Sequence, residues 1–330
     1  MKSSELGWLG VVVLAALAGY VFYPVGQQIA HGMANGEPFQ GGRPESYWIE
    51  ALNCNDQNAR VAAIDALARM GPRVIPDLIK KGQDPKFYGR ADVYEALAKM
   101  GEPAVPALVE VVKNDRASWG TCQPTFAKIG APAVPPMIEL LKGEDTGLQA
   151  FAAGVISQMG ERGADALPAL MEGVRESKET RGPKAKGPTL PSTVIDPSGN
   201  FSVRSLYVAA IGKLGPKGKP AIPLLLELIR GQNKAIAIVA MDALGDIGPD
   251  AAEAVPTLID VVKTAPNFGI VLVSARALGK IGPPAKAAVP ELMKYVEKPQ
   301  KSEVEQSAKE AVKQAIKQID PEFAQQHKIE

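Results

Sequence analysis

Charged side chains recur at fixed distances after seven prolines, and this spacing is the clearest chemical pattern in the sequence. In five repeats the residue four places after the proline is acidic, and a cation follows it three residues later. The acids are Glu110, Glu139, Glu172, Glu227 and Asp260, and the cations are Lys113, Lys142, Arg175, Arg230 and Lys263. Residues three apart are neighbours on a helix, so this +4/+7 ladder predicts either solvated intrahelical ion pairs or a striped binding groove for a partner of complementary charge.

Side chains that could perform catalysis or bind a metal are sparse. The two histidines, His31 and His327, lie outside the repeats, and no CxxC, HExxH, GxSxG or phosphate-binding Gly-Lys motif occurs. The two cysteines, Cys54 and Cys122, fall about two repeats apart, which is too far for a disulfide. A net charge of +1 provides no overall field that would favour nucleic acid. We therefore expect a non-enzymatic protein without a cofactor, a metal or a nucleic-acid partner.

Two further groups of residues are candidates for binding. Aromatic residues make up 5% of the chain, yet Phe87, Tyr88 and Trp119 fall close together, which fits either a binding patch or core packing. Four cations occur among glycines and prolines in residues 177–200, namely Lys178, Arg181, Lys184 and Lys186. That segment is either a tolerated spacer or a loop that contacts an acidic partner or lipid headgroups.

A repeated sequence motif must position the charged residues of the ladder. An apolar residue and a glycine are followed, after a short gap, by an apolar residue, a proline and an aliphatic run. The glycines are Gly71, Gly101, Gly130, Gly160, Gly215, Gly248 and Gly282, and the prolines are Pro76, Pro106, Pro135, Pro168, Pro223, Pro256 and Pro290. Successive glycines are 30, 29, 30, 55, 33 and 34 residues apart, so the fourth step contains an insertion. A recurring period of this length is typical of a repeat protein.

The residue pattern of each repeat predicts a pair of helices. Residues one, four and eight places before each glycine are almost always apolar or small, which indicates one face of a helix that the glycine ends. The proline lies in the first turn of a second helix, which is also amphipathic. A single pair cannot bury its apolar faces alone, so the pairs must stack. We predict an all-α fold, a right-handed α-solenoid of about seven helix pairs over residues 45–320, with a loop insertion at 177–200.

The first residues have a different composition. Residues 6–23 carry no charge and would span about 27 Å as a helix, which is enough to cross a bilayer. We predict a short tail at 1–5 and a single-pass transmembrane helix at 6–23. A cleaved secretory signal is the alternative, because residues 16–18 have the small-x-small form. We expect residues 24–44 to be a flexible tether, residues 321–330 a C-terminal tail, and the solenoid to lie on the extracytoplasmic side.

The stretch 58–71, followed by residues 74–78, resembles a HEAT repeat of the short type that also occurs in phycobilisome lyases. The resemblance covers residues 46–320 and implies that the second helices line the concave side of the stack. It also implies that Arg60, Arg90 and Arg204, each eleven residues before its glycine, hold the preceding loop. Residues 43–48, behind a membrane span, resemble bacterial envelope proteins of the family. This similarity implies a place in the cytoplasmic (inner) membrane of a bacterium.

Three functions are compatible with these patterns. The resemblance favours a membrane-tethered scaffold or adaptor that binds a protein partner through the solenoid surface. The alternative, a bilin-lyase-like or chaperone activity on a cofactor-carrying protein, rests on the resemblance alone. The third possibility is an architectural envelope protein without a discrete partner.

Overall fold

The structure is a computed structural model that describes residues 24–176, 202–297 and 302–329. The tail predicted at 1–5, the transmembrane helix predicted at 6–23 and the insertion at 177–200 lie outside these ranges. None of the helices inside them is both long enough and apolar enough to cross a bilayer. The chain divides into two compact units, Met1–Pro132 and Ala133–Glu330.

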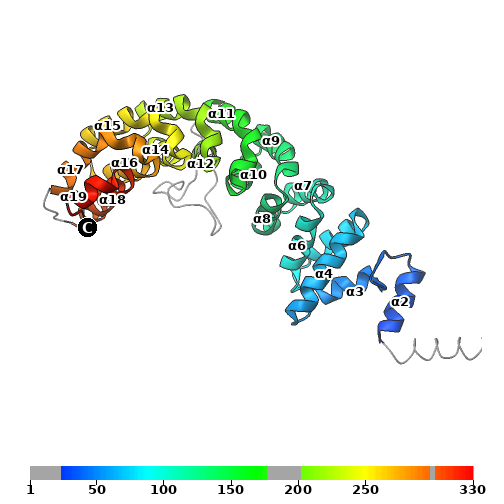
Figure 1. The fold of residues 1–330 in the computed structure, drawn as a ribbon. Coiled ribbons are helices and arrows are strands. Elements are labelled where there is room, and N and C mark those ends of the chain that lie inside the picture. Colours follow the sequence, from blue (N-terminus) through cyan, green and yellow to red (C-terminus); the bar gives the residue numbers. More distant parts are fainter. Residues whose placement is uncertain (1–23, 177–201, 298–301, 330) are drawn as a thin grey trace, which may run out of the picture. The chain divides into compact units, whose positions relative to one another are not determined.

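The described part of the first unit contains a helix, a two-stranded antiparallel hairpin and then a series of helices (Figure 1). Its elements are α2 (Pro24–Ala34), β1 (Phe39–Gln40), β2 (Arg43–Pro44), α3 (Glu45–Ala51), α4 (Gln57–Met70), α5 (Ile75–Gln83), α6 (Arg90–Met100), α7 (Val105–Asn114) and α8 (Trp119–Ile129). Short 3-10 helices lie at η1 (Pro72–Val74), η2 (Glu102–Ala104), η3 (Arg116–Ser118) and η4 (Ala131–Ala133), the last at the boundary between the units.

In the described part of the second unit, every regular secondary-structure element is a helix. Its α-helices are α9 (Val134–Lys142), α10 (Thr146–Met159), α11 (Leu167–Glu176), α12 (Val203–Lys213), α13 (Ile222–Arg230), α14 (Lys234–Ile247), α15 (Val255–Thr264), α16 (Phe268–Ile281), α17 (Val289–Glu297), α18 (Glu303–Ile319) and α19 (Pro321–Gln326). The 3-10 helices are η5 (Gly160–Ala166), η6 (Gly215–Ala221), η7 (Gly248–Ala254) and η8 (Pro283–Ala288).

The predicted helix pairs are confirmed in all seven repeats. Each helix-ending glycine adopts a positive φ, from 58° at Gly215 to 79° at Gly130 and Gly248, a conformation that glycine adopts without strain. Each repeat proline lies in the first turn of the next helix, where its missing N–H leaves no hydrogen bond unmade. In the later repeats the junction between the two helices is three residues longer, and its 3-10 helix is longer too: η7 has seven residues, whereas η1 has three. The repeats thus consist of Gly-ended helices followed by Pro-begun helices.

Within each unit, the core lies between each Pro-begun helix and the Gly-ended helix that follows it, and between successive Gly-ended helices. Residues two places after the repeat prolines are fully buried, and they are Leu78, Leu108, Met137, Leu170, Leu225, Leu258 and Leu292. Residues four places before the glycines are buried as well, including Leu67, Leu97, Phe126, Leu244 and Leu278. These positions confirm the apolar faces that the sequence predicts.

In the second unit, the Gly-ended helices α12, α14 and α16 come unusually close to α14, α16 and α18 respectively, at one register three residues before their own glycine. We call this set of contacts the glycine seam; it joins Gly212 to Ala243, Gly245 to Ala277 and Gly279 to Ala315. A Cβ added at Gly212 would lie 2.6 Å from the Cα of Ala243, far inside van der Waals contact. The backbones of α12 and α14 can therefore approach this closely only because position 212 has no side chain.

This close approach places the Gly-ended helices on the inner side of the second unit. In Figure 1, α12, α14 and α16 follow the inside of this unit's curve, and α11, α13 and α15 follow the outside. Along the inside, α14 packs extensively on both α12 and α16. Helices on the inside of a curved stack must be spaced more closely than those outside, and the glycine seam permits that spacing. The expectation that the Pro-begun helices line the concave side is therefore wrong for this unit.

Both predicted terminal segments are more ordered than expected. The flexible tether predicted at 24–44 instead contains α2 and the hairpin, and the Trp48 indole N–H donates to the Gln40 carbonyl at 3.0 Å. The tail predicted at 321–330 contains α19, whose N-cap is Asp320, and Ile329 is buried. Few large apolar residues occur in these segments, so composition did not reveal that they pack as end caps of the repeats.

One carboxyl group is buried in the N-terminal cap. Glu45, at the start of α3, is 5% exposed, and its Oε1 atom has no hydrogen-bond partner. Burial, and then the nearby charges of Asp77 and Glu37, raise the pKa of Glu45 from 4.5 to about 7. Because the folded pKa exceeds the unfolded one, the proton stabilises the fold at low pH, and that stabilisation disappears as the pH rises from 4.5 to 7.

We expect Glu45→Gln to remove this pH dependence, because the amide carries no charge at any pH. Stability of the parent protein should fall by at most about 3 kcal/mol between about pH 4.5 and pH 8, and the variant should lose much less. Urea unfolding followed by circular dichroism at the two pH values measures the difference. Equal pH dependence in the two proteins would contradict the burial of an ionisable Glu45.

Candidate functional site

The +4/+7 ladder lies on the exposed faces of the Pro-begun helices α7, α9, α11, α13 and α15. Intrahelical ion pairs form between Glu110 and Lys113, at 3.4 Å, and between Asp260 and Lys263, at 3.7 Å. These side chains are about half exposed or more, so each pair contributes little to stability. The solvated interpretation is confirmed for these two pairs. A role of the ladder in binding a partner stays a prediction.

Four ladder residues, Lys142, Glu172, Arg230 and Asp260, line two cavities in the second unit, each formed between two neighbouring repeats. Cavity A, of about 440 Å³, is lined by Leu141, Lys142, Gly143, Gln149, Ala169, Glu172, Gly173, Glu176, Val203 and Tyr207. Cavity B, of about 480 Å³, is lined by Ile229, Arg230, Lys234, Ala237, Ile238, Met241, Thr257, Asp260, Val261, Thr264, Ala265, Pro266 and Ile270.

The two cavities occupy the same place in the repeat. Each uses the +7 cation of one repeat, Lys142 or Arg230, and the +4 acid of the next repeat, Glu172 or Asp260. Both walls also include the residues one, five and eight places after the second proline, Pro168 in cavity A and Pro256 in cavity B. Two positions near the start of the Gly-ended helices also line both cavities: Gln149 and Val203 in cavity A, and Ala237 and Ile270 in cavity B. The ladder therefore brings an acid and a cation together across repeats, an arrangement that spacing within one helix did not indicate.

Cavity A is narrowed by an aromatic ring. Tyr207 is buried, and its hydroxyl donates to the carbonyl of Leu141 at 3.3 Å. Burial raises the pKa of Tyr207 to about 12, so the phenol is neutral at physiological pH. A Cβ at Gly173 would lie 2.4 Å from the Tyr207 ring, so this wall cannot carry a larger side chain without a shift. With Glu172 and Glu176 in its lining, cavity A is a polar site whose wall holds two carboxylates.

Cavity B combines an apolar wall with a polar rim. Most of its lining residues are apolar, and they come from α13, α14, α15, α16 and the connection between α15 and α16. At the rim, Arg230 donates to the hydroxyl of Thr257 at 3.0 Å, and Lys234 begins α14. The arrangement can take up an apolar side chain and place an anionic group against the two cations.

A second charge pattern, which the sequence analysis missed, lies on the Gly-ended helices. Asp246 of α14 pairs with Lys213 of α12 at 2.7 Å and with Lys280 of α16 at 2.6 Å. Burial opposes ionisation of Asp246, but the hydrogen bonds from the two lysines outweigh it and lower the pKa. In the first unit, Lys99 pairs with Asp65 of the preceding repeat. The signal was present two residues before Gly101, Gly215, Gly248 and Gly282 and six residues before Gly71, and these contacts join repeats.

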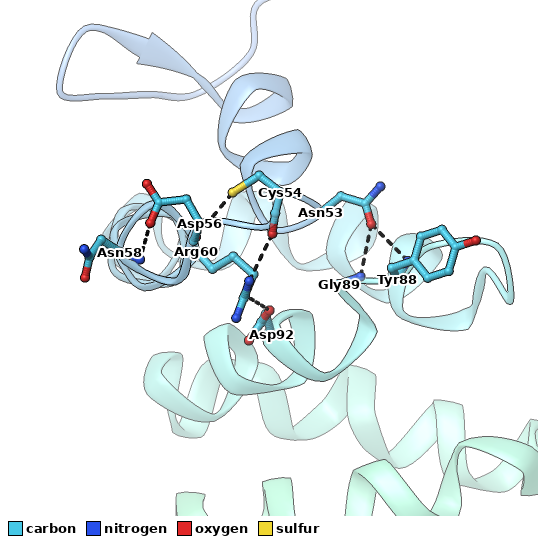
Figure 2. A network of polar contacts seen from close by, with 8 residues as sticks. All are labelled: Asn53, Cys54, Asp56, Asn58, Arg60, Tyr88, Gly89 and Asp92. Carbon is cyan, nitrogen blue, oxygen red and sulfur yellow. Dashed lines mark hydrogen bonds and ion pairs between the residues drawn. The ribbon is translucent and has the colours of Figure 1, made fainter.

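The aromatic candidates do not form one patch. Phe87 is buried, with the Lys81 ammonium 5.5 Å from its ring centre, and the Trp119 indole donates to the carbonyl of Val112 at 2.7 Å. Tyr88 is 92% exposed, and Figure 2 shows its ring directed away from the other residues drawn. The core interpretation therefore describes Phe87, whereas Tyr88 is a surface residue.

The backbone under Tyr88 is held by a polar network (Figure 2). The Asn53 side-chain oxygen accepts hydrogen bonds from the backbone N–H of Tyr88 at 3.0 Å and of Gly89 at 3.3 Å. Arg60 donates to the carbonyl of Cys54 at 3.0 Å and pairs with Asp92 at 3.2 Å. The loop-holding role expected of this arginine is confirmed.

Arg204 instead donates from its Nε to the carbonyl of Val174 in α11 at 2.8 Å, and Arg90 is exposed, so a loop-holding role of these two arginines stays a prediction. The four loop cations, Lys178, Arg181, Lys184 and Lys186, lie outside the described residues. Within the ranges 24–176, 202–297 and 302–329, no group of three or more His, Cys, Asp or Glu residues could hold a metal ion. Cys54 and Cys122 are both free thiols.

Comparison with known families identifies the repeats. A model of HEAT repeats matches residues 45–120 and 222–313, together about half of the chain. No curated protein matches the sequence.

Several solved structures are similar at low identity. A designed armadillo repeat protein in complex with the peptide (KR)4 is 14% identical, with a TM-score of 0.41 over 73% of this chain and 98% of that chain. The CpcE–CpcF complex of phycocyanin lyase from Nostoc sp. PCC7120 is 17% identical, with a TM-score of 0.30 over 83% and 96%. A mutant of Kap121p is 12% identical, with a TM-score of 0.47 over 88% and 35%.

Proposed function

The chain belongs to the HEAT-repeat family, and from this premise we propose that it is a non-enzymatic scaffold that binds a protein partner through the surface of its second unit. The observation that carries the proposal is the pair of cavities at equivalent places in the repeats. Two cavities at equivalent repeat positions suit an extended polypeptide, because a chain that runs along the stacked repeats can place one side chain in each.

The proposal includes a membrane tether. Residues 6–23 would span the cytoplasmic membrane, and the repeats would lie on its extracytoplasmic side. The uncharged run of eighteen residues, with aromatic side chains near both ends, supports this arrangement. A tethered scaffold would hold its partner close to the membrane surface.

Lysine-reactive crosslinking of the full-length protein in its native membranes, followed by mass spectrometry, tests the proposal. We expect Lys142, Lys234 or Lys263, which lie in or beside the two cavities, to form crosslinks to one recurrent protein. Crosslinks only to the chain itself or to lipid would contradict partner binding. Purification with a bound tetrapyrrole would instead favour the lyase-like alternative.

A further inference from the structure

Cavity B leaves aliphatic side chains accessible at the surface of the second unit. Ile238, Val261 and Ile270 are only partly buried, although each lies in a repeat whose core residues are fully covered. Below them, Met241 is 2% exposed, and its sulfur lies 3.2 Å from the hydroxyl of Ser274. The apolar wall therefore has a fixed base, and a bound aliphatic side chain would remove its exposed part from water.

The charge at the rim of cavity B is positive. The one carboxylate in the lining, Asp260, is paired with Lys263 at 3.7 Å, and the backbone carbonyl of Asp260 accepts from Thr264. Thr257 holds the guanidinium of Arg230 at 3.0 Å, which orients it without neutralising it. Lys234 is exposed and forms no ion pair within the described residues. Two cations are thus available to a ligand at one end of the apolar wall.

Cavity A provides an internal comparison with a different charge. Its lining holds two carboxylates, Glu172 and Glu176, against the single cation Lys142. At the position that Val261 occupies in cavity B, cavity A has Gly173, and the Tyr207 ring packs against that wall. Equivalent repeat positions therefore form an apolar site with two cations at cavity B and a polar site with two carboxylates at cavity A.

We propose that cavity B is a docking site for an acidic segment of a partner protein, in which an aliphatic side chain enters the apolar wall and a neighbouring carboxylate binds Arg230 and Lys234. The proposal rests on the scaffold function above and specifies the chemistry of the partner. Charge complementarity excludes a basic segment from this cavity, because its cations would face Arg230 and Lys234 across a short distance.

Fluorescence anisotropy on the full-length chain in lipid nanodiscs tests this inference with a defined probe. The probe is a labelled eight-residue peptide of alternating Leu and Asp, compared with alternating Leu and Lys and with alternating Ser and Asp. We expect the Leu-Asp peptide to bind most tightly. The double variant R230E/K234E should weaken its binding about tenfold or more and should favour the Leu-Lys peptide, since the rim charge is then reversed.

The control is Lys217→Glu, an exposed cation in η6 of the same unit that lines neither cavity, which should leave binding of the Leu-Asp peptide within about twofold. Equal binding of the Leu-Asp and Leu-Lys peptides, no binding of either to the parent protein, or no effect of R230E/K234E would overturn the proposal. If crosslinking still captured a partner protein in native membranes, the scaffold function would stand and only the assigned chemistry would fall. If ultracentrifugation showed self-association that R230E/K234E abolished, the occupant would be a second copy of the chain, which also overturns the proposal.

Discussion

Replacing Leu244 by Ala is expected to lower the free energy of unfolding by about 2–5 kcal/mol. Leu244 lies on α14, four residues before Gly248, and its side chain is fully buried on a helix that packs against α12, α13 and α16. The truncation removes buried methyl groups and leaves a cavity that the packed helices can fill only in part. Leu67→Ala should have the same effect in the first unit, because Leu67 occupies the equivalent position.

Urea unfolding followed by circular dichroism measures the overall loss for Leu244→Ala. Because repeat proteins can unfold in parts, hydrogen exchange of α14 and α16 should accompany it and show local loss of protection. Val304→Ala on α18 is the matched control, since Val304 is 58% exposed and should change stability by less than about 0.5 kcal/mol. A change of that small size for both Leu244→Ala and Leu67→Ala would show that the core is wrongly assigned.

A valine at Gly212 should destabilise the second unit by at least about 1–3 kcal/mol, the usual cost of overpacking. Even the Cβ would lie 2.6 Å from the Cα of Ala243, and the two methyl groups would crowd the backbone of α14 further. The helices can accept the side chain only by moving apart, which would also disturb the Lys213–Asp246 ion pair one residue along α12. The expected result is therefore a lower unfolding midpoint together with faster hydrogen exchange in α12 and α14.

Gly120→Val on α8 is the control for this substitution. Gly120 is also helical, but a Cβ there would meet nothing within 4 Å. Valine has a somewhat higher helix propensity than glycine, so this control should be neutral or more stable by a few tenths of a kcal/mol. If the two glycine variants had the same stability, the glycine seam would not be a close contact.

Local signals in the sequence predicted the repeats well. The positive φ of the helix-ending glycines and the first-turn position of the prolines depend on the chemistry of single residues, so the helix pairs followed from the chain alone. The buried leucines followed from a 3.6-residue period for the same reason. These features need no knowledge of how one repeat meets the next.

Contacts between repeats were not predicted, because they depend on spacing and rotation that no single helix encodes. The inner position of the Gly-ended helices follows from the closeness of Gly212 to Ala243, although glycine at that register was visible in the sequence. Arg230 and Asp260 of the next repeat line the same cavity B, whereas the spacing in the sequence related each residue only to its own helix. Glu45 gave no signal, because a glutamate at the start of a helix is ordinarily solvated.

The central claim is that cavity B binds a protein, and a photo-reactive residue placed at its rim tests it most directly. Thr264 lines the cavity and is exposed, so it can carry the crosslinker in the full-length protein in native membranes. Ala252 in η7 is exposed but is not part of the lining, and it provides the control position. We predict that illumination links one distinct protein to position 264 and not to position 252. The same adducts at both positions, or adducts at neither, would contradict the claim.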